Sequence, residues 1–318
     1  MKRADYAALT FAEHPHNPLI RPPFPSPILA DPTFVPPGES PDGRWHLFAH
    51  SLFGIHHFTS ADGLRWQRHE RICGNALRAC LLHHGKDYFL FYEKCRLMLP
   101  ILPGQSWASH IEVRHSKDLW HFGEPQVVLR PTLPWHHEPG RGSAVGNPCV
   151  IATPGGFRMY FSAGLVYLPD CGFCEPRSIG VAEAALPTGP FLPRPLPILT
   201  EQGTAPQQIG AGAIKVLPAA DGLVGFQNAI LWDAASKQSH SAIWLLGAAA
   251  DSEDSFTPLR SAPIVAPSSG WKQSHVYGLD ARWVGEKLWI FFNARNHSHW
   301  MRGREAIGLL QASQPAGR

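Results

Sequence analysis

The sequence predicts an all-β, five-bladed β-propeller that forms a single domain over residues 1–318. Abundant turn residues, five paired strand-like runs and a regular spacing between the pairs all indicate this fold. The chain contains 29 Gly and 31 Pro among its 318 residues, a composition that favours short strands joined by turns over long helices. Hydrophobic residues make up 44% of the chain and charged residues 17%, so we expect a sizeable core and no extended disorder.

Five pairs of β-rich runs follow one another along the chain, and a turn that contains glycine separates the members of each pair. The pairs are 27–35 with 44–50, 77–83 with 87–94, 147–153 with 157–162, 212–217 with 223–228, and 278–284 with 287–293. The turns hold Gly43, Gly85, Gly155, Gly222 and Gly285. Glycine between two such runs is a hairpin signal. The sequence therefore predicts five β-hairpins, each continued by a third strand.

The first strands of these hairpins recur at a spacing typical of propeller blades. Their landmark residues are Asp31, Arg78, Asn147, Ala213 and Asp280, at intervals of 47 to 69 residues. Units of this size form antiparallel sheets that bury their faces by stacking around a central axis. We place the blades at roughly 27–72, 77–130, 146–200, 211–265 and 277–313. A β-sandwich is the structural alternative, but it would not need five similar hairpins.

The fifth unit offers only three strands, at 279–284, 287–293 and 305–311. Propeller blades usually have four strands, and an unpaired edge strand invites aggregation. We therefore predict that a segment within Tyr6–Phe11 supplies the outer strand of the last blade and closes the ring.

Composition and charge restrict the partners that the protein can have. The 28 basic and 25 acidic residues leave a formal charge of +3, without the basic stripe of a nucleic-acid-binding protein. The longest apolar runs, such as 242–250, fall short of the ~20 residues that span a bilayer, and the first ten residues lack the apolar core of a secretory signal. We expect a cytoplasmic protein that binds neither nucleic acid nor membranes, and its oligomeric state stays open.

Cysteine and histidine residues do not form a metal-binding pattern. The six cysteines are scattered, and the Cys171-Gly-Phe-Cys174 motif lacks the second ligand pair of a structural zinc site. Several of the 18 histidines form doublets, whose side chains point to opposite faces of a strand. We predict no metal site and no cofactor.

Short motifs in the first 66 residues carry a resemblance to a known group. They are Asn17-Pro-Leu-Ile20, Ala30-Asp31-Pro32, the hairpin Asp42-Gly-Arg-Trp-His-Leu-Phe48 and Ser60-Ala-Asp-Gly-Leu-Arg-Trp66. Together they resemble the opening of the five-bladed propeller glycosidases of glycoside hydrolase families 43, 32 and 130, which include arabinanases, β-xylosidases, invertases and levanases. The resemblance extends through about Ser313.

The resemblance implies a carbohydrate-active protein whose substrate is a small-molecule carbohydrate. The most direct interpretation is a glycoside hydrolase that uses two carboxylates in the central funnel. Two alternatives stay open: a non-catalytic carbohydrate-binding propeller that serves polysaccharide or oligosaccharide metabolism, and a protein-interaction propeller. The resemblance also leaves room for a structural calcium ion in the central channel.

In these families the starts of the first strands and the ends of the second strands form one ring around the funnel. Three carboxylates of this chain fall on that ring, and hydrolysis needs one ionised and one protonated carboxylate. Asp31 stands where these families place the base or nucleophile, and we expect it to activate water. The families' proton donor is a Glu at the start of the third or fourth blade, which this chain lacks there, so we assign Glu93 on the ring as the proton donor and Asp280 as the residue that orients or tunes the pair. Glu138, in the third blade, is the alternative proton donor.

Each carboxylate on the ring also has a structural interpretation. Asp31 could form a turn at the start of a strand, and Glu93 could pair with a basic neighbour at the end of one. Asp280 could form a salt bridge with Arg282 or Arg295. The sequence leaves these alternatives open.

The ring and its neighbouring loops also supply candidate sugar-binding residues: Arg78, Asn147, His50, His275, Arg295, Trp107 and Trp135. Asn147 stands where the families usually carry a second Asp-Pro, so its amide can bind a hydroxyl group but adds no charge. Loop tryptophans stack on the apolar faces of sugar rings. We predict that the long loops 96–110 and 130–146 overhang the funnel, with Trp107 or Trp135 lining it.

Overall fold

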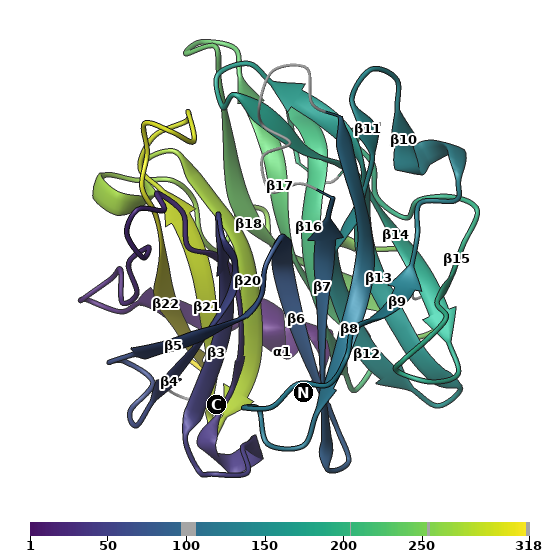
Figure 1. Ribbon diagram of the computed structural model, residues 1–318. Helices are drawn as coiled ribbons and strands as arrows, with labels where there is room; N and C mark the ends of the chain where they lie inside the picture. Colours follow the sequence, from purple (N-terminus) through teal and green to yellow (C-terminus); the bar gives the residue numbers. More distant parts are fainter. Residues whose placement is uncertain (97–105, 204, 253–254, 316–318) are drawn as a thin grey trace.

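The computed structural model describes residues 1–96, 106–203, 205–252 and 255–315. Within these residues the strands form five four-stranded units, blades I to V, which stand around a common axis (Figure 1). A single parallel pair, Ser241 with His275, joins blades IV and V into one continuous sheet. This architecture confirms the predicted all-β, five-bladed propeller.

Each blade runs from an innermost strand at the axis to an outermost strand at the rim. Blade I contains β2 (Ala30–Val35), β3 (Trp45–Ser51), β4 (Gly54–Ser60) and β5 (Gln67–Cys73); blade II contains β6 (Ala76–His84), β7 (Asp87–Cys95), β8 (Trp107–Ser116) and β9 (Gln126–Leu129); blade III contains β12 (Val145–Thr153), β13 (Gly156–Leu168), β14 (Phe173–Ala184) and β15 (Leu192–Pro193); blade IV contains β16 (Gln208–Ala219), β17 (Gly222–Asp233), β18 (Gln238–Ala249) and β19 (Thr257–Pro258); blade V contains β20 (His275–Val284), β21 (Lys287–Arg295), β22 (Glu305–Ser313) and β1 (Thr10–Glu13).

Helices are few and short in the described part of the chain: α1 (Arg3–Ala7), η1 (Pro37–Glu39), η2 (Pro134–His136) and η3 (Gly270–Lys272). Two further short strands, β10 (His137–Glu138) and β11 (Gly142–Ser143), extend blade II beside β8. None of the described helices is long and apolar enough to cross a membrane.

The N-terminal segment closes the ring, as the strand count predicts. β1 pairs antiparallel with β22, from Thr10 opposite Ser313 to Glu13 opposite Leu310. The closing strand begins later than the expected Tyr6–Phe11, because α1 precedes it and Tyr6 is buried in the core. The Trp283 indole N–H donates to the Tyr6 hydroxyl at 2.9 Å, so this segment is held by packing as well as by strand pairing.

The hydrophobic core lies between the blades rather than within any single blade. Leu90 and Phe91 are neighbours in β7, yet Leu90 packs toward blade I and Phe91 toward blade III. Phe291 and Phe292 in β21 divide in the same way between blades I and IV. Because successive side chains of a strand point to opposite faces, every blade needs two neighbours, and the closed ring provides them.

A β-bulge interrupts the innermost strand of every blade at the same level along the axis. The breaks in register fall between Ala30 and Thr33, Leu77 and Cys80, Gly146 and Cys149, Gly210 and Ala213, and Val276 and Leu279. In the first three blades the bulge places Asp31, Arg78 and Asn147 at positive φ, 49°, 55° and 47°. A bulge redirects a side chain that would otherwise continue the alternation of the strand. The bulges of blades I, II, III and V thus bring Asp31, Arg78, Asn147 and Tyr277 into the lining of one pocket.

Candidate functional site

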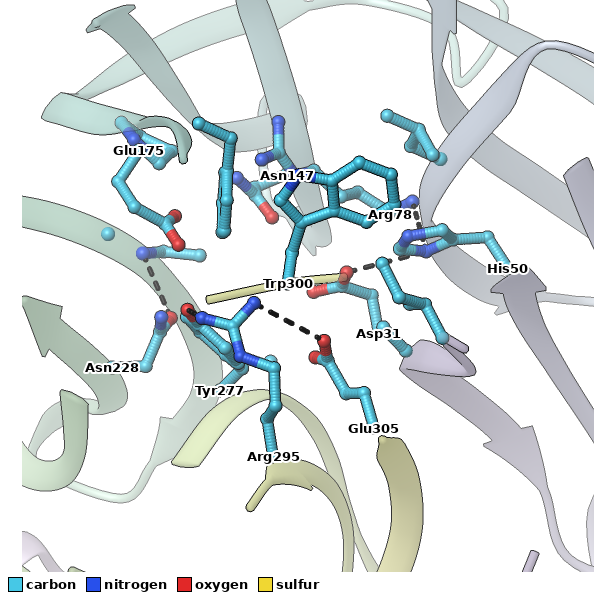
Figure 2. Close-up of a pocket in the computed structure, with 18 of the residues that line it drawn as sticks. Asp31, His50, Arg78, Asn147, Glu175, Asn228, Tyr277, Arg295, Trp300 and Glu305 are labelled. Atoms are coloured by element: carbon cyan, nitrogen blue, oxygen red, sulfur yellow. Dashed lines mark hydrogen bonds and ion pairs between the residues drawn. The ribbon is translucent and has the colours of Figure 1, made fainter. Parts of the chain in front are cut away.

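A pocket of about 120 Å³ opens at the level of the bulges. Its polar lining residues are Asp31, His50, Arg78, Asn147, Glu175, Asn228, Tyr277, Arg295 and Glu305 (Figure 2). Its aromatic lining comes from Trp107, Phe173 and Trp300 in addition to Tyr277. Polar groups that converge in a largely apolar concavity are typical of a ligand-binding site.

Asp31 is held in the pocket by its backbone and by its neighbours. Its backbone N–H donates to the Asn293 side-chain oxygen at 2.9 Å. His50 Nδ1 accepts the Arg78 backbone N–H at 3.2 Å and lies 3.4 Å from Asp31 Oδ2. A Cβ atom at Gly278 would collide with the Asp31 carboxylate, so glycine is required there for the carboxylate to occupy this place.

The electrostatic surroundings keep the Asp31 proton unusually strongly bound. Burial raises the pKa of Asp31 to about 6, with Arg78 opposing the shift and Glu175 and Glu93 adding to it. Burial, with smaller contributions from neighbouring charges, lowers the pKa of His50 to about 3. His50 is therefore a neutral ring at neutral pH and supplies no countercharge to Asp31.

Two glutamates share the pocket with Asp31. Glu305, at the start of β22, accepts a hydrogen bond from the Asn293 side-chain amide and lies 4.0 Å from Arg295. Burial raises its pKa to about 7, against the opposing effect of Arg295. Burial also raises the pKa of Glu175 in β14, again opposed by nearby arginines. Figure 2 shows Glu175 on the opposite side of the pocket from Asp31 and Glu305.

Arg295 lines one side of the pocket, and its side chain is only 1% exposed. Its Nη2 donates to the Tyr277 hydroxyl at 2.8 Å, and its guanidinium lies 5.2 Å from the centres of both the Tyr277 and Phe173 rings. Cation–π contact of this kind stabilises a buried guanidinium. Its Nε has no hydrogen-bond partner among the described residues.

Glu93, the predicted proton donor, does not line the pocket. The side chain is fully buried behind Arg78, whose Nη1 donates to Glu93 Oε2 at 2.7 Å. The Trp107 indole N–H donates to the other carboxylate oxygen at 2.9 Å. Both oxygens therefore serve to orient two residues that do line the pocket, Arg78 and Trp107.

Asp280 is also misplaced by the sequence prediction, because the bulge in β20 lies before it. Asp280 comes after the point where pairing with β21 resumes at Leu279, and its side chain is fully buried below the pocket. Lys215 Nζ lies 2.9 Å from one carboxylate oxygen and Arg282 Nε 3.4 Å from the other. Despite the opposing effect of burial, these two cations lower the pKa of Asp280. The salt-bridge alternative with Arg282 is the observed one.

Asp280 also ties blade V to blade I. The Thr33 hydroxyl donates to Asp280 Oδ2 at 2.8 Å and the Phe34 backbone N–H donates to the same oxygen at 3.0 Å. Since Lys215 comes from blade IV, one carboxylate joins three blades at the axis. These contacts are those of a joint between blades rather than of a group that lines the pocket.

Three further predicted residues lie outside the pocket. His275 is buried next to Arg295 and Cys171 rather than facing the pocket. Trp135 stacks on Phe161 and donates its indole N–H to the Pro195 carbonyl at 3.0 Å. Glu138, the alternative proton donor, does not line the pocket. Its carboxylate pairs with Arg177 at a distance of 3.1 Å.

The remaining predicted site residues converge in the pocket. They are Asp31, Arg78, Asn147, His50, Arg295 and Trp107. Of the loop predicted to overhang the funnel at 96–110, residues 97–105 lie outside the described residues. Trp107 lines the pocket, as expected for one of the two loop tryptophans.

Sequence reasoning missed Glu175 and Glu305 because both begin the third strand of a blade. The ring predicted from the sequence includes only first-strand starts and second-strand ends. A third strand, however, begins at the end of the blade where the second strand finishes, so its first side chains can reach the same ring. The signal that could have found them is a Glu within the first three residues of β14 or β22.

Metal-binding clusters are absent from the described residues: no three His, Cys, Asp or Glu side chains there are arranged to hold a metal ion. The polar side chains that could contact a ligand are those that line the pocket. They offer carboxylates for proton transfer, and amide and guanidinium groups for hydrogen bonding to hydroxyls.

No protein-family model matches the chain, and no curated protein matches it. Solved structures are similar, among them an N-acetylgalactosamine deacetylase from F. plautii in complex with blood group B trisaccharide. It has a TM-score of 0.67 and 11% identity over 96% of this chain and 95% of that chain. A family 117 glycoside hydrolase from Zobellia galactanivorans has a TM-score of 0.62 and 14% identity over 98% and 92%.

A third similar structure represents family 130 of mannoside phosphorylases, which contains glycoside hydrolases that target β-1,2-mannosidic linkages in Candida mannan. Its TM-score is 0.60, with 12% identity over 96% of this chain and 94% of that chain. At these identities the similarity establishes the architecture alone: this chain has the five-bladed propeller fold of these proteins over nearly its whole length.

Proposed function

We propose that this protein is a glycoside hydrolase that cleaves a glycosidic bond of a small carbohydrate in the axial pocket. The observation that carries the proposal is the pair Asp31 and Glu175, two carboxylates of raised pKa that face each other across the pocket. Perturbed carboxylates in a cleft are typical of catalytic sites. The same fold occurs in solved glycoside hydrolases.

In this proposal Asp31 is the base or nucleophile and Glu175 is the proton donor. Glycoside hydrolysis needs two carboxyl groups that flank the scissile bond, one ionised and one protonated. Asp31, with a pKa of about 6, is ionised at neutral pH. Burial favours the protonated form of Glu175, and its place across the pocket lets it protonate the leaving oxygen.

Glu305 and the other lining residues hold the substrate and the catalytic pair. The Asp31 backbone N–H and the Glu305 carboxylate both bond to the Asn293 side chain, so Asn293 links Glu305 to the proposed base. Trp107 and Trp300 provide aromatic surfaces for the apolar face of a sugar ring. Asn147, with its neutral amide, binds a hydroxyl group.

We also propose the finer features that the motif resemblance implies. The activity is most similar to that of family 43 enzymes, it needs no cofactor, and the protein works in the cytoplasm. Activity should then survive dialysis against EDTA, which also tests for an ion in the central channel. Loss of activity that added calcium restores would contradict the cofactor-free proposal.

A non-catalytic carbohydrate-binding propeller is the second candidate. Asn147 favours it, because this uncharged side chain lines the pocket where the related enzymes carry an acidic one. Such a protein would bind sugars in the same pocket without cleaving them.

A substrate panel separates the two candidates. It contains aryl arabinosides, xylosides, fructosides, mannosides and galactosides together with natural oligosaccharides. Wild type should release sugar from at least one, and Asp31→Asn should lower that rate at least ~100-fold while the protein stays folded. Wild-type protein that binds sugars by calorimetry but cleaves none would replace the hydrolase proposal with the binding one.

A further inference from the structure

A second, smaller cavity of about 40 Å³ lies on the axis next to the pocket. The two cavities share Asp31, Arg78 and Asn147 in their linings. Room for one water molecule requires roughly 10–15 Å³ of such volume, so this cavity can hold about three water-sized groups. Cys80 and Cys149 face into it.

The propeller repeat explains why two thiols meet there. Cys80 and Cys149 are the residues at which β6 and β12 resume pairing after their bulges, opposite Phe91 and Tyr160. They therefore occupy the same level in adjacent blades II and III. Both side chains line this one cavity, each contributed by one of the two adjacent blades.

Blade IV supplies the groups that make the two sulfur atoms different. Lys215 Nζ lies 3.6 Å from Cys80 Sγ, and the Val216 backbone N–H donates to Cys149 Sγ at 3.2 Å. The hydrogen bond from Cys149, together with Lys215, lowers the pKa of Cys80 to about 6, although burial opposes this. The same hydrogen bond and burial raise the pKa of Cys149 well above its ordinary value.

Among the cysteines of the described residues, Cys80 alone has a lowered pKa. Burial raises the pKa of Cys73 to about 11 and that of Cys171 to about 12, and it raises that of Cys95 as well. Because the thiolate is the reactive form, Cys80 is the nucleophilic sulfur at neutral pH. Cys149 is a protonated thiol beside it, in the place of a resolving cysteine.

We propose that Cys80 and Cys149 form an oxidisable dithiol site on the propeller axis, which reacts with hydrogen peroxide that enters through the pocket. The Cys80 thiolate attacks one peroxide oxygen, the O–O bond breaks, and hydroxide leaves, so Cys80 becomes a sulfenic acid. The Cys149 sulfur then attacks the Cys80 sulfur, the S–O bond breaks, and water leaves. The two steps oxidise two thiols to one disulfide and reduce one peroxide to two waters.

The disulfide would link blades II and III directly beneath Arg78 and Asn147. It would also remove the thiolate that Lys215 faces and leave Asp280 as the ion-pair partner of this lysine at 2.9 Å. The site stands on the thiol pair and its cavity, and therefore does not depend on the proposed hydrolase activity.

Peroxide titration of the full-length protein with peptide mapping tests the proposal. Native protein is exposed to hydrogen peroxide at pH 7, quenched with iodoacetamide, digested and analysed by mass spectrometry. We expect a reducible crosslink between the peptides that contain Cys80 and Cys149, formed at least ten times faster than any change at Cys171. Oxidation of the cysteines at equal rates, or no crosslink to Cys149, would overturn the proposal.

Three variants separate the roles of the residues. Cys149→Ala should stop the reaction at a Cys80 sulfenic acid that dimedone traps, whereas Cys171→Ala, a matched buried thiol, should leave the crosslink intact. Lys215→Met should slow the loss of the Cys80 thiol at pH 7 several-fold, and raising the pH should recover the rate. If the variants do not fold, the wild-type rate between pH 5 and 8 decides: a flat profile contradicts a Cys80 thiolate.

Discussion

Two groups of carboxylates stand at the axis of this propeller, and their surroundings differ. Asp31, Glu175 and Glu305 line the pocket, where burial outweighs the cations and raises the pKa of each carboxyl. Glu93 and Asp280 lie behind the pocket lining, fully buried. Each of these has a cation within 3 Å, Arg78 at 2.7 Å and Lys215 at 2.9 Å.

Close cations distinguish the carboxylates that hold the blades together from those that can exchange a proton. A buried carboxylate whose oxygens are all satisfied by close cations and donors cannot exchange a proton without breaking the fold. A carboxylate held in place without a close countercharge stores unfavourable energy that a reaction can use. Burial alone does not separate the two groups, because Glu175 and Glu305 are buried as well.

The largest expected effect is on catalysis. Glu175→Gln should lower kcat at least ~100-fold for substrates with poor leaving groups, and much less for dinitrophenyl glycosides, whose leaving group needs no proton. Glu93→Gln should instead raise KM more than it lowers kcat, because it loosens Arg78 and Trp107. Steady-state kinetics on both substrate types measure these effects. Equal changes of kcat and KM in the two variants would contradict Glu175 as the proton donor. Glu138→Gln, a carboxylate outside the pocket, is the control.

The next effect is on stability. Asp280→Asn should lower the free energy of unfolding by about 3–5 kcal/mol, because it leaves Lys215 and Arg282 buried without their partner. The loss should be present at pH 7 and should shrink as pH falls, since a carboxylate of lowered pKa contributes stability only while it is ionised. Urea denaturation of variant and wild type, at pH 7 and at an acidic pH, measures this difference in the free energy of unfolding. A change below 1 kcal/mol would show that Asp280 is not the joint between the blades.

The opposite sign is expected for Asp31. Its pKa of about 6 in the folded state lies above its ordinary value of 3.8, so the folded state loses stability as pH rises from about 4 to 6. Asp31→Asn removes this cost and should stabilise the protein at pH 8 by on the order of 2–3 kcal/mol, with no gain at pH 4. Paired denaturation curves check this. Equal stability of variant and wild type at both pH values would place Asp31 among the structural carboxylates.

The smallest effect is expected at the rim of the propeller. Deletion of residues 1–12 removes α1 and most of β1, which pairs with β22, so the melting temperature should fall by several degrees. The pH profile of any hydrolase activity should stay the same, because both groups of carboxylates lie at the axis. An unchanged melting curve would show that β1 is not needed to close the ring.

The difference between predicted and observed site residues follows from the bulges. Asp31, Arg78 and Asn147 share one position in three blades, so the repeat itself placed them correctly. In blade V the bulge residues are Tyr277 and Gly278. Asp280 follows this bulge and therefore lies beyond the level of the pocket. No local pattern marks where a bulge falls, because the extra residue depends on pairing with the neighbouring strand.

The number of blades, the closure of the ring by the N-terminal segment and the place of Asp31 were all predictable from the sequence. These depend on turn residues, hairpins and their period, which are local properties of the chain. Which carboxylates face the pocket, in contrast, depends on contacts between blades. Asp280 pairs with Lys215 from another blade, and Glu93 pairs with Arg78. Glu175 and Glu305 belong to the third strands of their blades. Burial and charge at a point arise from residues distant in sequence, and a pKa responds to that sum rather than to any local pattern.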